Sequence, residues 1–178
     1  MEVAEALALI DKIIEEHRII LGDIRDFTQD TNDVVAIRGL DQTREDFVPG
    51  RLEDQKQSLG NWQESLLAVD RGIQAHFHRE ETALVDAVAE YGDNDLASVL
   101  RHWLAEHKEL RERLGKMKQD VAGLVIDTSA QSVWQEKAWG IRVYMTHTGK
   151  LFDVHVRGEQ KMMQRLRNLL EAKVENTS

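Results

Sequence analysis

The stretch HFHREET, residues 76–82, lies inside a long segment in which apolar residues recur at intervals of three and four. That spacing is typical of an amphipathic α-helix with one face in a core. His76 and Glu80 continue the apolar face, whereas the other charged residues of the stretch, Glu81 among them, are rotated away from it. The pattern therefore predicts a helix that turns one imidazole and one carboxylate into the protein interior.

Three other segments show the same helical period. The four predicted helices span about residues 3–28, 52–91, 95–124 and 131–173. A polar stretch at about 29–51, which contains Gly39 and the single proline, Pro49, predicts a long connection between the first two helices, with room for helical pieces of its own. Long amphipathic helices with otherwise short connections favour an all-α fold, an antiparallel up-and-down four-helix bundle. We expect the chain, 1–178, to form one domain with a tail from about residue 174.

Composition narrows the possible partners. The 178 residues are 42% hydrophobic and carry a net charge of −9, and no Lys/Arg cluster forms the basic face that nucleic acid requires. No run of about 18 apolar residues and no N-terminal signal pattern is present, so we expect no membrane span and a cytoplasmic location. Because cysteine is absent, His and carboxylate side chains must hold any metal.

Each predicted helix carries at least one metal-ligand side chain on its apolar face. In chain order these residues are His17, His76, Glu80, His107, His155 and Glu159. Burying such groups without compensating charge costs several kcal/mol each, and a shared cation would supply that charge. The i,i+4 spacing within each His–Glu pair places both side chains on one helix face, where they can address one site.

The chain also contains an internal repeat. EHRIILGDI at 16–24 matches EHKELRERL at 106–114, and the pair His76–Glu80 is echoed by His155–Glu159. Two helical hairpins related by a pseudo-twofold axis would bring four imidazoles and two carboxylates together. Such a symmetric arrangement suits two metal ions.

These residues resemble the hemerythrin-like family, the His-His-Glu cation-binding four-helix bundles, from Glu16 to about Leu170. The resemblance is closest to the variant with four His and two Glu ligands. It implies that the four histidines are terminal iron ligands and that the two glutamates bridge two irons. Oxygen-carrying hemerythrins are similar but have a fifth histidine and a C-terminal Asp ligand. Here Trp103 and Arg111 flank His107 at four residues, and Gln160 stands where the Asp would be, which argues against reversible oxygen transport.

Imidazole and carboxylate donors without thiolate favour iron or manganese over zinc. The resemblance implies two non-haem iron ions, with manganese or zinc less likely. An oxo or hydroxo bridge would still leave open coordination positions, where O2, peroxide or nitric oxide could bind. We therefore expect a protein that binds or reacts with such a molecule in sensing or in the response to oxidative or nitrosative stress. Iron storage or donation for repair of iron centres is the alternative, and the choice between monomer and homo-oligomer stays open.

Each feature also has a structural interpretation. A single inward histidine is more often a buried neutral imidazole, and a single HxxxE pair is more often a surface ion pair; only their joint occurrence on four helices favours metal over a metal-free interaction module. We expect His102 to be solvated and Trp103 to fill the core or form a pocket wall. Glu16 and Glu106 could accept hydrogen bonds from the ligands, but helix geometry favours a solvated position for both.

Overall fold

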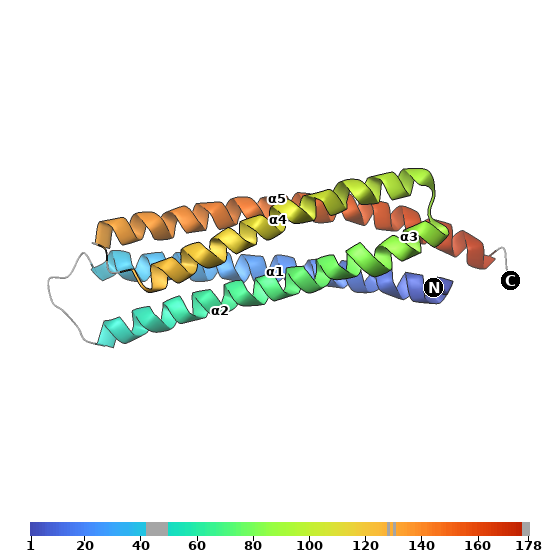
Figure 1. Ribbon diagram of the computed structural model, residues 1–178. Helices are drawn as coiled ribbons and strands as arrows, with labels where there is room; N and C mark the ends of the chain where they lie inside the picture. Colours follow the sequence, from blue (N-terminus) through green and yellow to red (C-terminus); the bar gives the residue numbers. More distant parts are fainter. Residues whose placement is uncertain (42–49, 128, 130, 176–178) are drawn as a thin grey trace. The chain divides into compact units, whose positions relative to one another are not determined.

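The computed structural model describes residues 1–41, 50–127, 129 and 131–175, and nearly all of them are helical. The helices are α1 (Val3–Asp41), α2 (Gly50–Arg79), the π-helix η1 (Glu80–Leu84), α3 (Val85–Tyr91), α4 (Asn94–Val125) and α5 (Gln131–Glu175). The elements α2, η1 and α3 follow one another without a break, so they form one of four long helical stretches (Figure 1). The predicted all-α bundle is confirmed.

The first connection differs from the prediction. The helix α1 continues to Asp41 and α2 begins at Gly50, so the described parts of the predicted connection at 29–51 extend the two flanking helices instead of forming separate helical pieces. Between Asp33 and Arg38 the chain contains neither Gly nor Pro, and nothing there interrupts a helix that has already begun. The remainder of the predicted connection, 42–49, lies outside the described residues.

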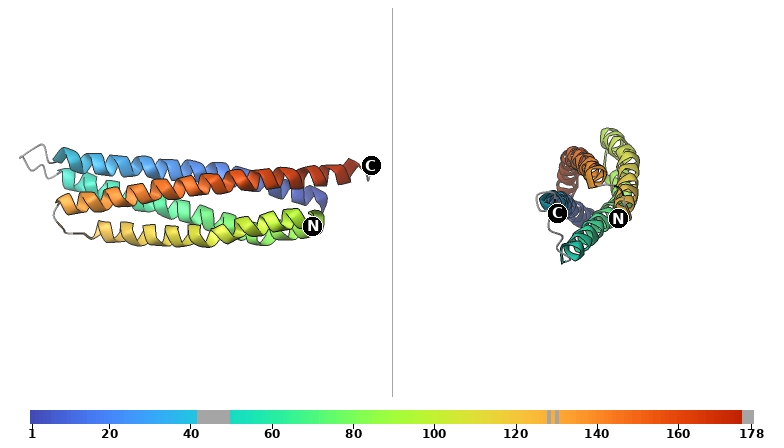
Figure 2. Two further views of the ribbon diagram at one scale, coloured as in Figure 1. Left: turned by 90° about the horizontal axis from the view of Figure 1, so that it is seen from above. Right: turned by 90° about the vertical axis from the view of Figure 1, so that its left-hand side faces the viewer.

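The chain divides into two compact units. Unit 1 comprises Met1–Leu21, Arg71–Arg111 and Leu151–Ser178, and unit 2 comprises Gly22–Asp70 and Glu112–Lys150. Within each unit, sections of all four helical stretches run side by side in alternating directions (Figure 2). The assignment of the whole chain to one domain stays a prediction.

Unit 2 has an apolar interior. The rings of Phe27 and Trp62 stack with centroids 5.6 Å apart, and both side chains are fully buried. Trp134 is also fully buried, and its indole Nε1 donates a hydrogen bond to the carbonyl of Leu124 at 3.2 Å. These aromatic side chains bury large apolar areas, so hydrophobic burial stabilises this unit.

Unit 1 combines an apolar cluster with buried polar side chains. The apolar cluster joins residues such as Ile10, Leu84, Leu100 and Leu166, each no more than 3% exposed. The buried ionisable residues of the described chain are His17, His76, Glu80, His107, His155 and Glu159. All six belong to unit 1.

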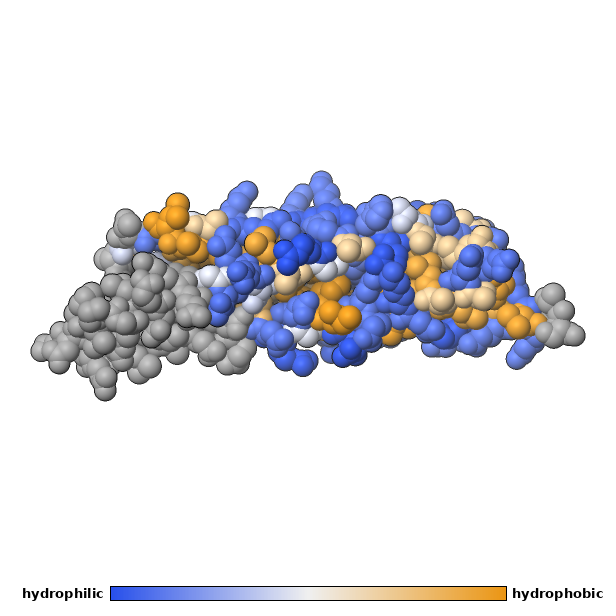
Figure 3. Space-filling view, turned by 90° about the horizontal axis from the view of Figure 1, so that it is seen from below, coloured by the Kyte–Doolittle hydropathy of each residue, from blue (hydrophilic) through white to orange (hydrophobic). Residues whose placement is uncertain are grey.

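The surface of the described residues is mixed. On the face that Figure 3 shows, hydrophilic residues predominate and apolar ones lie scattered among them. In the described part of the chain, no helix combines the length and the apolar character needed to cross a membrane.

Candidate metal centre

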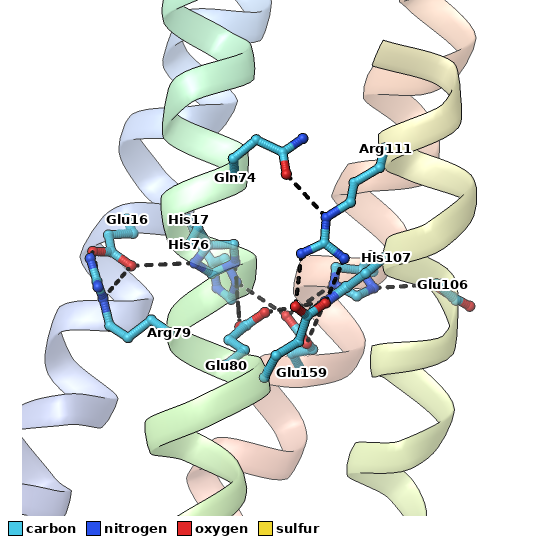
Figure 4. Close-up of polar contacts among 12 residues, drawn as sticks. Glu16, His17, Gln74, His76, Arg79, Glu80, Glu106, His107, Arg111 and Glu159 are labelled. Atoms are coloured by element: carbon cyan, nitrogen blue, oxygen red, sulfur yellow. Dashed lines mark hydrogen bonds and ion pairs between the residues drawn. The ribbon is translucent and has the colours of Figure 1, made fainter. Parts of the chain in front are cut away.

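The six side chains that the helical period turns inward lie together in unit 1. Each is at most 1% exposed. His17 comes from α1, His76 from α2, and Glu80 is the first residue of η1. His107 comes from α4, and α5 supplies the remaining pair, one turn apart. The imidazoles and carboxylates labelled in Figure 4 point toward one another between the helices.

The six residues form two overlapping groups, each able to hold a metal ion. The first, here called the α1–α2 position, consists of His17, His76, Glu80 and Glu159. The second, the α4–α5 position, consists of Glu80, His107, His155 and Glu159. In each group the potential ligand atoms lie within 4.8 Å of one another, and both groups share the two glutamates. Both groups therefore draw on the same pair of carboxylates.

The inward-facing atoms make no hydrogen bond with any described residue. The Nε2 atoms of His76 and His107 lie 3.3 Å from the Glu80 carboxylate, and those of His17 and His155 lie 3.2 and 3.3 Å from Glu159. Although these distances permit ion pairing, all four Nε2 atoms and all four carboxylate oxygens lack a hydrogen-bonded partner. Leaving such buried groups unsatisfied costs about 1–3 kcal/mol each, and more for charged groups. The donors therefore fit a cation, which would satisfy them together.

Burial and mutual charge set unusual pKa values in this cluster. Burial lowers the pKa of His76 to about 3 and that of His155 to about 4, and neighbouring imidazoles add to both effects. Burial also opposes the charged form of His17, but the carboxylates of Glu159 and Glu80 outweigh it and raise its pKa to about 9.

The pKa values of the two buried glutamates are also shifted in opposite directions. Burial raises the pKa of Glu159 to about 8, whereas the nearby imidazoles of His107 and His17 overcome the effect of burial and lower the pKa of Glu80. Two carboxylates this close cannot both ionise easily without a cation. The metal-free cluster therefore retains protons that a bound cation would replace.

A second layer of carboxylates lies behind the imidazoles. Glu16 contacts His76 Nδ1 at 3.4 Å, and Glu106 contacts His155 Nδ1 at 3.1 Å; the sequence left this role open for both glutamates but favoured a solvated position. The carboxylate of Glu81, expected to point away, lies 2.9 Å from His107 Nδ1. Each imidazole partner is on a different helical stretch from its glutamate, which the helical period cannot reveal.

Aromatic side chains enclose the centre. Phe77 stacks on the ring of His107 with centroids 3.7 Å apart, and Phe152 packs edge-on against His17 at 6.4 Å. Trp103 meets His155 edge-to-face at 5.7 Å and lines a surface pocket of about 520 Å³. These rings exclude water from the imidazoles, which strengthens electrostatic interactions inside the centre.

Gly158 provides the space for one of these rings. A Cβ atom built at Gly158 would lie 2.1 Å from Cζ2 of Trp103, closer than any real contact. The absence of a side chain directly before Glu159 therefore allows the indole to pack over α5 beside His155.

The other three histidines lie outside the centre, and His102 is solvated as expected. The side chain of His102 is 67% exposed, with a carboxylate oxygen of Glu106 at 3.8 Å. His78 is exposed, and His147 belongs to unit 2, where its ring approaches Arg113 at 3.5 Å.

The helix geometry changes at Glu80. The π-helix η1 begins there, and the backbone N–H of Val85 donates to the carbonyl of Glu80. π-Helical turns inside α-helices occur frequently at functional sites. The corresponding glutamate, Glu159, lies in the uninterrupted α-helix α5, so the two halves of the internal repeat are not identical in backbone.

A helical protein that buries four imidazoles and two carboxylates in one cluster falls into the class of cation-binding helical proteins. The family model for the hemerythrin HHE cation binding domain matches residues 10–167. The chain therefore belongs to the hemerythrin family, as the sequence resemblance predicted, and is a cation-binding hemerythrin-like protein. No curated protein and no solved structure shows a significant match to it.

Proposed function

We propose that the protein holds a non-haem di-iron centre and that this centre binds or reacts with O2, peroxide or nitric oxide, in sensing or in the response to oxidative or nitrosative stress. The proposed ligands are His17, His76, Glu80, His107, His155 and Glu159. One observation carries the proposal: eight buried nitrogen and oxygen atoms of these six residues converge without hydrogen-bonded partners.

The number of donors supports open coordination. Four imidazole nitrogens and four carboxylate oxygens provide eight donor atoms for the roughly twelve positions of two octahedral ions. A di-iron pair would supply redox chemistry and free positions for a small ligand. The enclosing rings of Phe77, Phe152 and Trp103 limit the space beside the imidazoles, which favours small molecules over large ones.

Two of the proposed ligands also hold protons that must leave when a cation binds. The raised pKa values of His17 and Glu159, about 9 and 8, mean that both groups carry protons near neutral pH before a cation binds. Both protons must leave when Nε2 of His17 and the carboxylate of Glu159 become ligands, so cation binding is coupled to proton release. Glu16, Glu81 and Glu106 accept hydrogen bonds at the outer nitrogens and orient their imidazole partners.

The alternatives differ from this proposal in measurable ways. Iron storage or donation requires that iron leave the centre readily for an acceptor, whereas sensing or catalysis requires that iron be retained through cycles of reaction. A metal-free interaction module would have to keep six buried ionisable side chains without a cation, which burial energies disfavour. Manganese and zinc remain competitors for the same donors.

The first test is metal analysis of protein purified without added metal and of protein reconstituted anaerobically with ferrous iron. We expect about two irons per chain and near-ultraviolet charge-transfer absorption that dithionite bleaches. O2, peroxide and nitric oxide would then be added in turn to the reduced protein. A protein that takes up no iron, or that takes it up without any spectral response to these three molecules, contradicts the proposal.

A further inference from the structure

The internal repeat allows the two metal positions to be compared residue by residue. In the alignment of EHRIILGDI with EHKELRERL, His17 corresponds to His107 and Leu21 to Arg111. In the alignment of the two His–Glu pairs, Glu81 corresponds to Gln160. The proposed ligands are the same in both halves, but the residues behind them differ.

The α4–α5 position has a complete second layer. The Glu81 carboxylate lies 2.9 Å from Nδ1 of His107, and Glu106 lies 3.1 Å from Nδ1 of His155. Arg111 holds Glu81 by two hydrogen bonds, of 2.6 and 2.8 Å, and donates a third, of 3.0 Å, to the side-chain oxygen of Gln74. Carboxylates therefore orient both imidazoles of this position, and Arg111 in turn holds the Glu81 carboxylate in place.

The α1–α2 position lacks half of this layer. Nδ1 of His17 is buried and has no hydrogen-bond partner among the described residues. The counterpart of Glu81 is Gln160, which is exposed, and the counterpart of Arg111 is Leu21, which cannot hold a carboxylate. Nδ1 of His76 has only a long contact, 3.4 Å, to Glu16.

Glu16 is also shared with another group. The guanidinium of Arg79 donates to it from Nε at 3.0 and 3.2 Å and from Nη2 as well. Glu16 and Glu81 are thus both paired with a guanidinium, but the Glu16 carboxylate lies 3.4 Å from its imidazole nitrogen, whereas that of Glu81 lies 2.9 Å away. The α1–α2 position therefore has one long carboxylate contact where the α4–α5 position has two shorter ones.

Hydrogen bonds of this kind affect metal affinity. A carboxylate on Nδ1 fixes the tautomer in which Nε2 faces the metal, and loss of such a partner typically reduces metal affinity 10- to 100-fold. We infer that the two metal positions are unequal: the α4–α5 position fills first, and Glu81, held by Arg111, is the positioning residue that makes it the tighter one. This inference rests on the proposed two-ion centre.

Unequal positions give the protein a half-loaded state. When the concentration of free cation lies between the two dissociation constants, one ion occupies the α4–α5 position and the other position exchanges. The α1–α2 position would then report cation supply while the first ion remains bound. If the two positions had equal affinity, no range of cation concentration would fill one position and leave the other empty.

Binding of Co2+, which is visible by its absorption, tests the order of filling in two matched variants. His17→Ala removes a ligand from the α1–α2 position only, and His107→Ala removes one from the α4–α5 position only. We expect the His17→Ala protein to bind one ion with about the first-step affinity of the wild type. The His107→Ala protein should bind its one ion 10- to 100-fold more weakly. Equal affinities, or the reverse order, overturn the inference.

A second pair of variants leaves all six proposed ligands in place. Glu81→Gln should weaken the first binding step of the wild type about 10- to 100-fold and Glu16→Gln should weaken only the second. The melting temperature in chelator should change equally little in both, so that a change in affinity is not a change in folding. Weakening of only the second step in Glu81→Gln contradicts the inference. A wild-type protein that binds no Co2+ and no Fe2+ instead contradicts the proposed function itself.

Discussion

Units 1 and 2 are built from sections of the same four helical stretches, but their interiors are stabilised differently. In unit 2 the centre is filled by aromatic and aliphatic side chains such as Phe27, Trp62 and Trp134, all fully buried. In unit 1 the same helical period buries six ionisable side chains whose inward atoms lack hydrogen-bonded partners. Burial of apolar side chains therefore stabilises the interior of unit 2, whereas the buried donor atoms of unit 1 fit a bound cation.

The comparison predicts the largest effect for Glu80→Ala, because Glu80 belongs to both metal positions. Loss of its two oxygens should reduce the bound iron from about two ions per chain to one or fewer. With iron at about 1,000 times its dissociation constant, the stability lost with the metal is about 4 kcal/mol. Metal analysis and thermal unfolding with and without iron measure both quantities. His102→Ala, whose side chain is exposed, is the control and should change neither.

The same comparison predicts that Leu66→Ala, in unit 2, destabilises the protein without affecting metal content. Leu66 is 1% exposed, and removing a buried leucine side chain costs about 3 kcal/mol through lost burial and the cavity left behind. The loss in stability should be the same with and without iron, and the iron content should remain that of the wild type. A Leu66→Ala protein that folds yet loses iron would show that metal binding in unit 1 depends on the apolar interior of unit 2.

Much of this contrast follows from the sequence. The 3.6-residue period identified four helices and turned all six ionisable residues inward, because a buried polar residue is conspicuous on an apolar face. The period also led to errors. It places a residue on its own helix but not against a partner helix. The contact of Glu81 with His107 was therefore missed, and a solvated position was favoured for Glu16 and Glu106.

Two other features had no clear signal in the sequence. Phe77 lies about 100° around the helix from His76 and was not assigned to the core, but it is fully buried and stacks on His107. A helix enclosed by neighbours buries a wider arc than one apolar stripe. The π-helix η1 was also missed, because its extra residue changes backbone hydrogen bonding and leaves no mark in the apolar spacing.

The metal-free protein should show a pH optimum that comes from unit 1. The pKa values of His76 and His155 are lowered to about 3 and 4, so their contribution is present above the unfolded value of 6.5 and is lost as pH falls below it. Those of His17 and Glu159 are raised to about 9 and 8, so their contribution is lost as pH rises through these values. The melting temperature in chelator should therefore be highest near pH 6.5 and fall toward pH 9. A melting temperature that rises between pH 7 and 9 would contradict this assignment of charges.

The smallest predicted effect is the change in stability when one glycine in each unit is replaced by alanine. At Gly123, in unit 2, an added Cβ meets no atom within 4 Å, so Gly123→Ala should stabilise the protein by up to about 1 kcal/mol through helix propensity. At Gly158, in unit 1, the added Cβ would collide with the indole of Trp103, and such overpacking costs about 1–3 kcal/mol, which exceeds the gain in propensity.

Chemical denaturation of both variants measures whether each substitution raises or lowers the free energy of unfolding. Because Trp103 contacts His155 edge-to-face, its displacement in Gly158→Ala should also change indole fluorescence and its quenching by added Co2+, whereas Gly123→Ala should leave both unchanged. Stabilisation by both substitutions would mean that the indole moves aside without cost, and that the packing over α5 does not constrain the ring beside the candidate metal centre.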